Sequence, residues 1–440
     1  MKIIPTSPSS RLRQLVIRRR GFTTPAVAIA LLVTMAGLAL ILDRLWLDAT
    51  DLELTTAAEA AALAAASELV SDDLLKPTPD PELRAELALT AAAYVAGQNV
   101  VAGAAVVLNT SPQGDVRFGQ LVLDSQSQRV RFVETPINPT TAVVTSMRTR
   151  RTNNPVAMFV AGLTQLPFGD IVTRVEATVD NRVIGVRPLE NLPVPALPLA
   201  IWYMDPTGAR TDTWNGQIES GVGPDNYGYD PIGHQVLSGP DGIPEITLHS
   251  QANGQQITDA NLTVVDLGTG LNDQDLDRQF ASGWTADDLT AFGGEFLLPV
   301  GTSQTLNASA ELRSADRTAM DSLIGQPRIC LLYSLVTPTG TSGTTGQATC
   351  IQLVSIRVLM VNDLGNGGCQ VVAQPCVVKT RTAMVNEMSP YYMMTENADG
   401  SMTAQLTMTD QTNPNDPTSN TTTVLSITPN PYLYKLRLTH

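Results

Sequence analysis

The sequence lacks the residue patterns on which most enzymes depend. It contains no GxSxG nucleophile motif, no phosphate-binding loop of the form GxxxxGK followed by Ser or Thr, and no HExxH zinc motif. Only three histidines occur in 440 residues, namely His234, His249 and His440. We interpret His234 and His249 as exposed loop residues, and such sparse histidines do not support a Ser-His-Asp triad. The sequence therefore predicts a protein with no catalytic activity and no cofactor.

Positive charge is also scarce. The chain has 28 Lys and Arg against 42 Asp and Glu, a net charge of −14, and several of its basic residues lie in the N-terminal arm. Phosphate affinity comes from clustered basic residues, and no such cluster follows Arg20. The short group Arg148, Arg150 and Arg151 is interpreted as a solvated strand end. Nucleic acid is therefore excluded as an expected partner.

Cysteine is rare, and all four cysteines come late in the chain. Outside the cytoplasm an even number favours disulfides, and no CxxC spacing supports a zinc site. Cys330 and Cys350 flank a predicted hairpin turn near Gly340 and could face each other across two strands. Cys369 and Cys376 bracket a short segment that could close a small loop. Four cysteines allow three connectivities, and reduced cysteines remain an alternative.

The most prominent feature present is an uninterrupted apolar run from Phe22 to Leu42. It carries no charge, and as a helix it would extend about 30 Å, the thickness of the hydrocarbon core of a bilayer. Arg18, Arg19 and Arg20 precede it, and acidic residues follow it. The positive-inside rule therefore predicts a single-pass protein with a cytoplasmic N-terminus and the rest of the chain periplasmic or extracellular. The predicted partner of this run is the lipid bilayer.

A cleaved secretory signal is the alternative interpretation of the same run. Its basic start and apolar core fit a signal peptide, but the core is longer than the usual 7–15 residues. The chain then continues Asp43-Arg44-Leu45-Trp46, with no cleavage site of the small-x-small type. We therefore expect a retained anchor.

The helical pattern continues beyond the membrane. Alanine-rich turns ending in AAEAAALAAASELV predict one helix of about 45 residues, because alanine is the best helix former. Its smooth alanine face could admit a partner helix or pack on its own domain, and the predicted partner face comprises Ala57, Ala60, Ala61 and Ala64. The prolines of 76–81 end this helix, and a second helix is expected from about Pro81 to Ala96.

From about residue 100 the pattern changes to short β runs separated by Asn, Pro, Gly and Asp. The expected fold class is α+β: the transmembrane helix, the long alanine-rich helix, a small antiparallel-sheet module and a β-rich C-terminal domain. PYLYKLRLTH is a candidate last strand. The expected divisions are a cytoplasmic basic arm (1–21), the transmembrane helix (22–42), the α+β module (43–187), a proline-rich linker or edge segment (188–200), the β-rich domain (201–380) and a Met-, Thr- and Asn-rich extension (381–440).

Two acidic clusters in 201–380 offer alternative functions. Oxygen ligands at Asp225, Asp230 and Asp241 could hold calcium in a surface adhesin, although turn chemistry explains the same residues. Carboxylates such as Asp225, Asp241 and Glu245 could serve an envelope-anchored hydrolase. The run 272–277 alternates carboxylates as a calcium loop does, but Arg278 and Trp284 replace the required Gly and Glu. A solvated helix start is the expectation there.

The N-terminal region resembles a known family. Arg19-Arg20-Gly21, the apolar run, Asp43-Arg44 and the alanine helix from Ala57 to Ala66 resemble TadG-like proteins of the Flp (tight adherence) pilus assembly system. The segments GDVRFGQLVLD, AVVTSMRTRRTNNPVAMFVAGL and VEATVDNRVIGVRP also look like that family's exported domain. The resemblance covers roughly residues 15–200.

This resemblance implies a membrane-anchored accessory protein that contacts other pilus-assembly or envelope proteins, or acts in adhesion. Related pseudopilins are cut after a glycine that is followed, five residues on, by glutamate. Gly21-Phe22 has the form of such a processing site, but its fifth residue is Ala26. We therefore expect an anchored component rather than a polymerising pilin.

Overall fold

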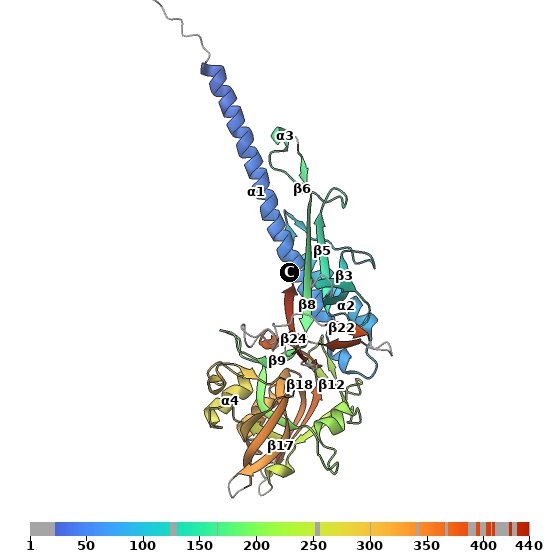
Figure 1. Cartoon of the computed structure of the whole chain (residues 1–440), viewed down its shortest axis with the longest axis vertical. Coiled ribbons are helices and arrows are strands. Elements are labelled where there is room, and N and C mark those ends of the chain that lie inside the picture. Colours follow the sequence, from blue (N-terminus) through green and yellow to red (C-terminus); the bar gives the residue numbers. More distant parts are fainter. Residues whose placement is uncertain are drawn as a thin grey trace, which may run out of the picture. The chain divides into compact units, whose positions relative to one another are not determined.

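The computed structural model describes residues 23–123, 130–164, 166–250, 256–299, 301–339, 343–365, 368–385 and 429–439, with four short strands between 393 and 424. The protein is of mixed α+β class, with one long N-terminal helix followed by a β-rich remainder, as expected (Figure 1). Two compact units are distinguished. The first comprises residues 1–53 and 147–172, and the second comprises residues 54–146 and 173–440. The predicted boundary at 188–200 does not coincide with this division.

Helix α1 (Thr23–Glu68) contains 46 residues and confirms the predicted helix of about 45. Pro25 lies in its first turn, where proline is tolerated. The expected break follows, with a short 3-10 helix η1 (Asp72–Leu75) before α2 (Pro81–Gln98). The Asp80 carboxylate caps α2 by accepting a hydrogen bond from the Leu83 amide, while proline occupies the first helical position.

The second unit contains a six-stranded sheet. Its strand order is β20-β26-β8-β5-β3-β4, and β26 pairs antiparallel with β8 and parallel with β20. The apolar and β-branched runs noted in the sequence form four of these strands. The bounds are β3 (Val116–Leu123), β4 (Val130–Glu134), β5 (Thr141–Arg148), β8 (Ile171–Asp180), β20 (Val378–Lys379) and β26 (Leu433–Thr439). The predicted last strand is thus confirmed as β26.

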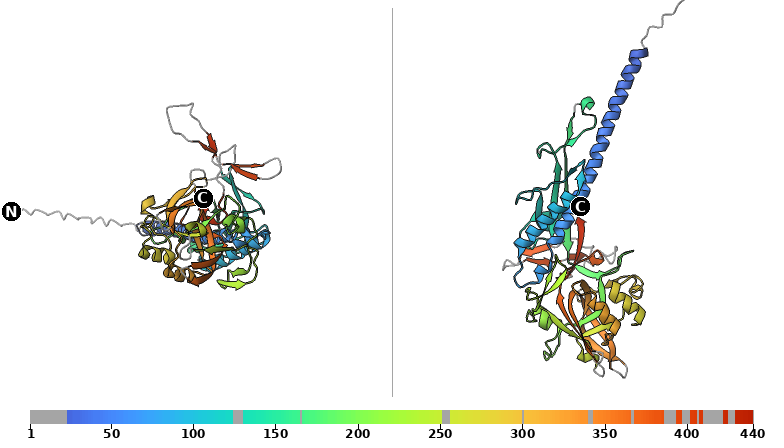
Figure 2. Two further views of the ribbon diagram at one scale, coloured as in Figure 1. Left: turned by 90° about the horizontal axis from the view of Figure 1, so that it is seen from below. Right: turned by 180° about the vertical axis from the view of Figure 1, so that it is seen from behind.

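The second unit also contains a seven-stranded sheet in the order β13-β19-β18-β16-β14-β10-β17. The long strands β17 and β18, orange in Figures 1 and 2, pair with each other and so close five strands into a ring. Most of the protein's hydrophobic core belongs to this region. The bounds are β10 (Ala196–Trp202), β13 (Ile246–His249), β14 (Leu262–Val265), β16 (Gln304–Ser309), β17 (Pro327–Thr339), β18 (Thr345–Gly365) and β19 (Gly368–Pro375).

The segment predicted as a linker over 188–200 ends earlier than expected. From Ala196 it forms β10, which lies between β14 and β17 and is buried along most of its length. Pro198 is tolerated in this strand although proline lacks a backbone amide donor. The pairing of β10 with β17 is irregular between Ala196 and Ala200, so the missing donor falls where the ladder is already interrupted. The segment therefore contributes core strand rather than a free or edge connection.

Shorter elements complete the described chain. A three-stranded sheet joins β9 to both β15 and β21, and the remaining strands form local hairpins. The strands are β1 (Val100–Val101), β2 (Ala104–Ala105), β6 (Val156–Ala157), β7 (Phe168–Gly169), β9 (Val183–Val186), β11 (Tyr227–Asp230), β12 (Gln235–Ser238), β15 (Phe296–Leu297), β21 (Ala383–Val385), β22 (Met393–Glu396), β23 (Met402–Gln405), β24 (Thr407–Thr409) and β25 (Thr422–Val424). The helices are α3 (Ala161–Thr164), η2 (Asn215–Glu219), η3 (Ile257–Asp259), α4 (Asp273–Ser282), η4 (Thr290–Phe292) and α5 (Ser314–Asp321).

The expected cysteine pairs do not form. All four cysteines are free and buried. In the β17–β18 register Cys330 faces Val354, while Cys350 lies four residues, or about 13 Å, further along β18. Cys369 and Cys376 are separated by the length of β19, roughly 20 Å. A disulfide needs Cα atoms within about 7 Å, so strand geometry excludes both predicted pairs.

The predicted partner-helix face is largely occupied by the protein's own packing. Ala57 and Ala61 are 1% and 0% exposed, and Ala60 and Ala64 are partly buried. The hydroxyl groups of Thr55 and Thr173 lie 3.2 Å apart, which places this half of α1 beside β8 within the second unit. Of the two interpretations of the alanine face, packing on its own domain is the correct one for Ala57 and Ala61.

A buried carboxylate organises the connection after α4. Asp288 is 1% exposed and accepts hydrogen bonds from the amide and hydroxyl of Thr285, each at 2.7 Å. The amide side chain of Gln279 and the guanidinium of Arg278 also donate to it. This one carboxylate therefore holds the end of α4 against the loop that follows it.

Candidate functional site

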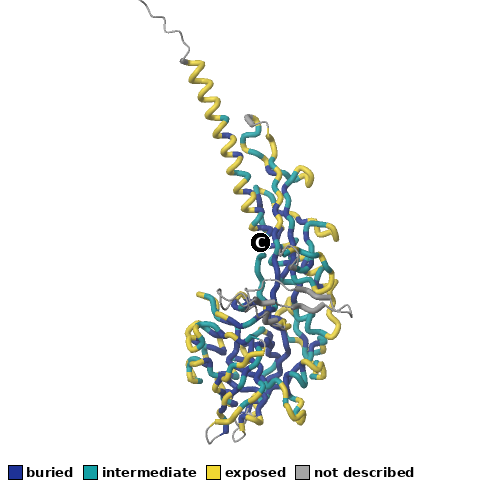
Figure 3. The backbone as a smooth tube through the Cα atoms, in the orientation of Figure 1, coloured by how far each residue is buried: buried dark blue, intermediate teal, exposed yellow. Residues whose placement is uncertain are grey.

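The apolar half of α1 is exposed over most of its surface. Ten large apolar side chains between Val27 and Leu42 are 54–68% exposed, and this stretch is yellow in Figure 3. By length and composition α1 is able to cross a membrane, although a signal sequence passes the same test. A helix that is hydrophobic on every side needs an apolar surrounding. This surface is the first element of the candidate site.

A buried carboxylate lies where the apolar run ends. Asp43 is 2% exposed, and its Oδ1 accepts hydrogen bonds from the amides of Phe159 and Val160 at 2.9 and 3.1 Å. These amides belong to the β6–β7 hairpin, defined here as the described residues 155–164 and 166–169, which include α3. Asp43 and the hairpin lie in the same compact unit. The first acidic residue after the apolar run therefore fastens a distant hairpin to the helix.

Trp46 extends this attachment by one turn. Its indole Nε1 donates to the Ala157 carbonyl at 3.1 Å, and its ring lies 4.8 Å from that of Phe159, tilted by 55°. The side chain of Leu47 lies so close to Gly169 that a Cβ there would meet it at 2.5 Å. Glycine at 169 thus permits the close approach of hairpin and helix.

Replacing Asp43 with alanine should loosen the hairpin. Two backbone amides would lose their acceptor, a loss that typically costs about 1–3 kcal/mol for buried groups. We expect faster hydrogen–deuterium exchange at Phe159 and Val160 in the detergent-solubilised full chain. Asp48→Ala is the matched control, because the Asp48 side chain is 53% exposed and pairs with Arg44 on its own helix. Equal exchange in the two variants would contradict the assigned role of Asp43.

Several residues singled out in the sequence fall outside the described part of the chain. These are the topology residues Arg18, Arg19 and Arg20, the processing site Gly21-Phe22, and His440. His234 is exposed between β11 and β12, as expected. His249, predicted in a loop, instead ends β13, where it is half-buried and burial lowers its pKa.

The basic group at the end of β5 is only partly solvated. The Arg148 side chain is buried and donates to the backbone and side-chain oxygens of Asn154. Arg150 is 64% exposed, with Asp170 at 3.6 Å, and Arg151 is exposed. The prediction of a solvated strand end is therefore right for Arg150 and Arg151 and wrong for Arg148.

Asp225, Asp241 and Glu245, the carboxylates considered for hydrolysis, lie near one another. Each of them, however, accepts hydrogen bonds from backbone amides. Asp225 accepts hydrogen bonds from the amides of Asp241 and Gly242, each at 2.9 Å. Glu245 is 0% exposed and its Oε1 accepts from the amides of Asn226 and Tyr227. Burial raises the pKa of Glu245, and the neighbouring Asp225 and Asp241 charges add to the effect. The arrangement is that of a loop held by carboxylates.

The calcium alternatives receive no positive support from the geometry. Among the described residues, no group of three or more His, Cys, Asp and Glu could hold a metal ion. Asp230 accepts a hydrogen bond from the Ile232 amide in its own turn. The run 272–277 is the predicted helix start, since Asn272 caps α4 by accepting from the Asp275 amide at 3.0 Å.

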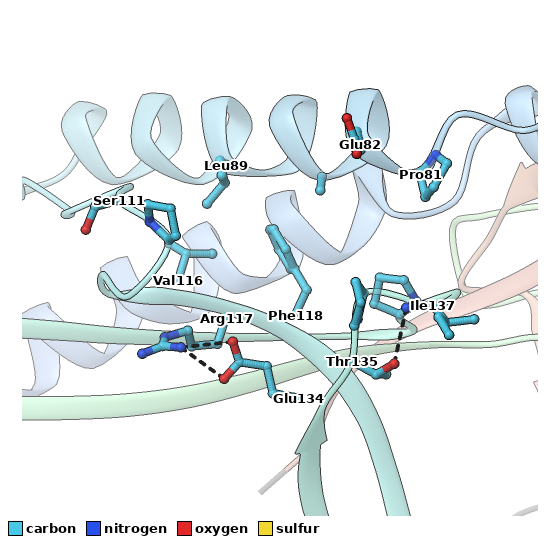
Figure 4. Close-up of a pocket in the computed structure, with 14 residues that line it drawn as sticks. Pro81, Glu82, Leu89, Ser111, Val116, Arg117, Phe118, Glu134, Thr135 and Ile137 are labelled. Atoms are coloured by element: carbon cyan, nitrogen blue, oxygen red, sulfur yellow. Dashed lines mark hydrogen bonds and ion pairs between the residues drawn. The ribbon is translucent and has the colours of Figure 1, made fainter.

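A cavity of about 620 Å³ lies between α2, β3 and the turn after β4 (Figure 4). Apolar groups and four prolines form most of its wall. At one end the Arg117 guanidinium donates to both oxygens of Glu134 at 2.9 and 3.0 Å. Sequence reasoning missed this cavity, because loops distant in the chain enclose it. The cavity is open and mostly apolar, and the Glu134 carboxylate at its end is already paired with Arg117.

Comparisons with protein-family models, with curated proteins and with solved structures found no match for this chain. The function is therefore inferred from the protein's own residues.

Proposed function

We propose that this protein is a single-pass, membrane-anchored envelope protein without catalytic activity that acts through protein–protein contacts in Flp (tight adherence) pilus assembly or in adhesion. The observation that carries the proposal is the 46-residue helix α1. Its first half exposes most of its apolar side chains, and from Leu54 onward its alanine-rich face is buried in the protein's own fold. One helix therefore carries both the proposed bilayer-spanning segment and a segment packed in a folded unit.

The charges around the apolar run support the proposed orientation. Arg18, Arg19 and Arg20 precede it, whereas Asp43 and Asp48 follow it. The positive-inside rule then leaves the N-terminus in the cytoplasm and both the hairpin and the β-rich remainder outside. This arrangement agrees with the resemblance to TadG-like proteins over residues 15–200, with 43–187 as the exported module of that type.

We propose that the second unit is the part of the protein that binds other envelope proteins. Its two sheets supply a rigid support, and its four buried cysteines pack as small hydrophobic groups. The hydrolase and calcium-adhesin alternatives are less well supported, because Asp225 and Glu245 are already bound to backbone amides.

The mass and N-terminal sequence of the protein from isolated membranes test the anchor. We expect the full chain, beginning at Met1, to stay in the membrane pellet after alkaline extraction. A product that begins at Phe22 would indicate peptidase processing and a pilin-like subunit. A soluble product that begins after Leu42 would identify the apolar run as a signal peptide and reject the proposal.

The pilus role has its own test. Deleting the gene in its host should abolish surface pili or adherence, and the full chain should restore them. A chain in which a cleavable signal replaces residues 1–42 is the matched comparison, because it exports the same domains without the anchor. Normal piliation after deletion would reject the role in assembly.

A further inference from the structure

The β6–β7 hairpin is uncharged and exposes apolar side chains. No charged residue occurs between Arg151 and Asp170. Three of its large apolar side chains nevertheless point into solvent: Phe159 is 69% exposed, Leu166 55% and Phe168 44%. An uncharged loop that presents two phenylalanines and a leucine has a surface suited to an apolar environment.

The attachment places this hairpin beside the apolar run. Asp43 and Trp46 contact it at residues 157–160, immediately after the run ends at Leu42. In Figure 1, α3 lies further toward the N-terminal end of α1 than β6 does. The tip of the hairpin is therefore directed toward the membrane-spanning half of the helix.

Burial on the helix agrees with this direction. Ala39 is 3% exposed, whereas its neighbours Leu38 and Leu40 are each 55% exposed. Ala39 lies four residues before Asp43 and so about 6 Å deeper along the helix axis, on the same face. That face is therefore covered for one turn inside the apolar run.

We propose that the β6–β7 hairpin is a second membrane contact, with its tip in the interfacial layer of the bilayer and Phe159, Leu166 and Phe168 against lipid. This inference rests on the proposed function, because it takes α1 as the membrane anchor. The lipid surface is favoured as the occupant by the continuity of the hairpin with the exposed apolar surface of α1. The aromatic rings of Trp46 and Phe159 suit the depth at which the acyl chains meet the headgroups.

The base of the hairpin carries positive charge, which is complementary to anionic lipid headgroups. Arg150 and Arg151 are both exposed there, outside the uncharged tip. Basic side chains at this level attract anionic lipid headgroups. Two backbone donors at the start of the tip are already satisfied, since the amides of Phe159 and Val160 donate to Asp43.

The test uses the full chain reconstituted in vesicles of phosphatidylcholine and phosphatidylglycerol. Leu166→Cys and Phe168→Cys are labelled separately with an environment-sensitive fluorophore, so a folding defect in one variant leaves the other. Ile232→Cys is the matched control, because Ile232 is an apolar residue 90% exposed in the β11–β12 turn. The wild-type chain, whose cysteines are all buried, reports background labelling.

We expect blue-shifted emission at positions 166 and 168, protection from aqueous iodide, and quenching by spin-labelled lipid several-fold stronger than at 232. Water-like emission at both positions in vesicles that carry the protein through flotation would overturn the hairpin contact and leave the anchor standing. Blue-shifted emission without lipid quenching would identify a protein cover, such as a second copy, and also overturn it. A chain that fails to float with the vesicles would refute the anchor and the hairpin contact together.

Discussion

A chain carrying Leu32→Arg and Met35→Arg should no longer be retained by the membrane. Both residues lie near the centre of the apolar run and are 60% and 54% exposed. Each arginine at the centre of a spanning helix costs about 2.5–3.5 kcal/mol on insertion scales, so the pair costs about 5–7 kcal/mol. A cost of that size shifts the insertion equilibrium by at least a thousandfold. Alkaline extraction followed by immunoblotting measures the change.

The same helix supplies the matched control. Leu45 and Leu52 are 59% and 69% exposed but lie beyond the apolar run. Leu45→Arg and Leu52→Arg add the same two charges where water or headgroups solvate them, so this double variant should remain in the pellet. If the central double variant also stayed there, α1 would not be the anchor.

Replacing Asp288 with asparagine should destabilise the second unit by about 3–5 kcal/mol. The change leaves the Arg278 guanidinium without its buried partner and weakens the bonds from Gln279 and Thr285. The loss should fall near the lower limit, because the Arg278 side chain is 35% exposed and keeps some water. Chemical denaturation of the detergent-solubilised full chain measures it. Asp287→Asn, at the exposed neighbouring position, is the control and should change stability little.

The pH dependence of this loss has a defined sign. Burial alone would raise the pKa of Asp288, but hydrogen bonds from Arg278, Thr285 and Gln279 outweigh it and lower the pKa to about 2. A depressed pKa stabilises the fold above the unfolded value of about 3.9, and that contribution disappears as pH falls through about 2. The difference between wild type and Asp288→Asn should therefore shrink below pH 4. A difference that stayed constant down to pH 2 would contradict this account.

Local patterns in the sequence predicted many of the elements. The alanine-rich run and the prolines of 76–81 located the end of α1 and the start of α2, because helix propensity and proline geometry act within a few residues. Short β runs bounded by turn-forming residues likewise located β3, β5 and β8. These signals depend on neighbours in the chain, and a single sequence contains them.

Features that depend on distant parts of the chain were missed. The proline content of 188–200 suggested a linker, but pairing with β14 and β17 makes Ala196–Trp202 a buried strand. Spacing around Gly340 suggested that Cys330 faces Cys350, but the strand register offsets them. The attachment of Phe159 to Asp43 spans 116 residues, and no local pattern indicates it. The acidic residue after the apolar run was visible in the sequence, but the hairpin that it holds was not.

Strand β26 has a consequence for how the protein matures. Leu433–Thr439 completes the six-stranded sheet by pairing with β8, and Thr439 bonds to Glu176 across 263 residues. In a chain exported from its N-terminal anchor, β8 emerges long before this partner. Until β26 has emerged, β8 has an unpaired edge that other strands can join. A segment far downstream of β8 thus completes the sheet, and the edge of β8 stays open to aggregation until that segment has joined it.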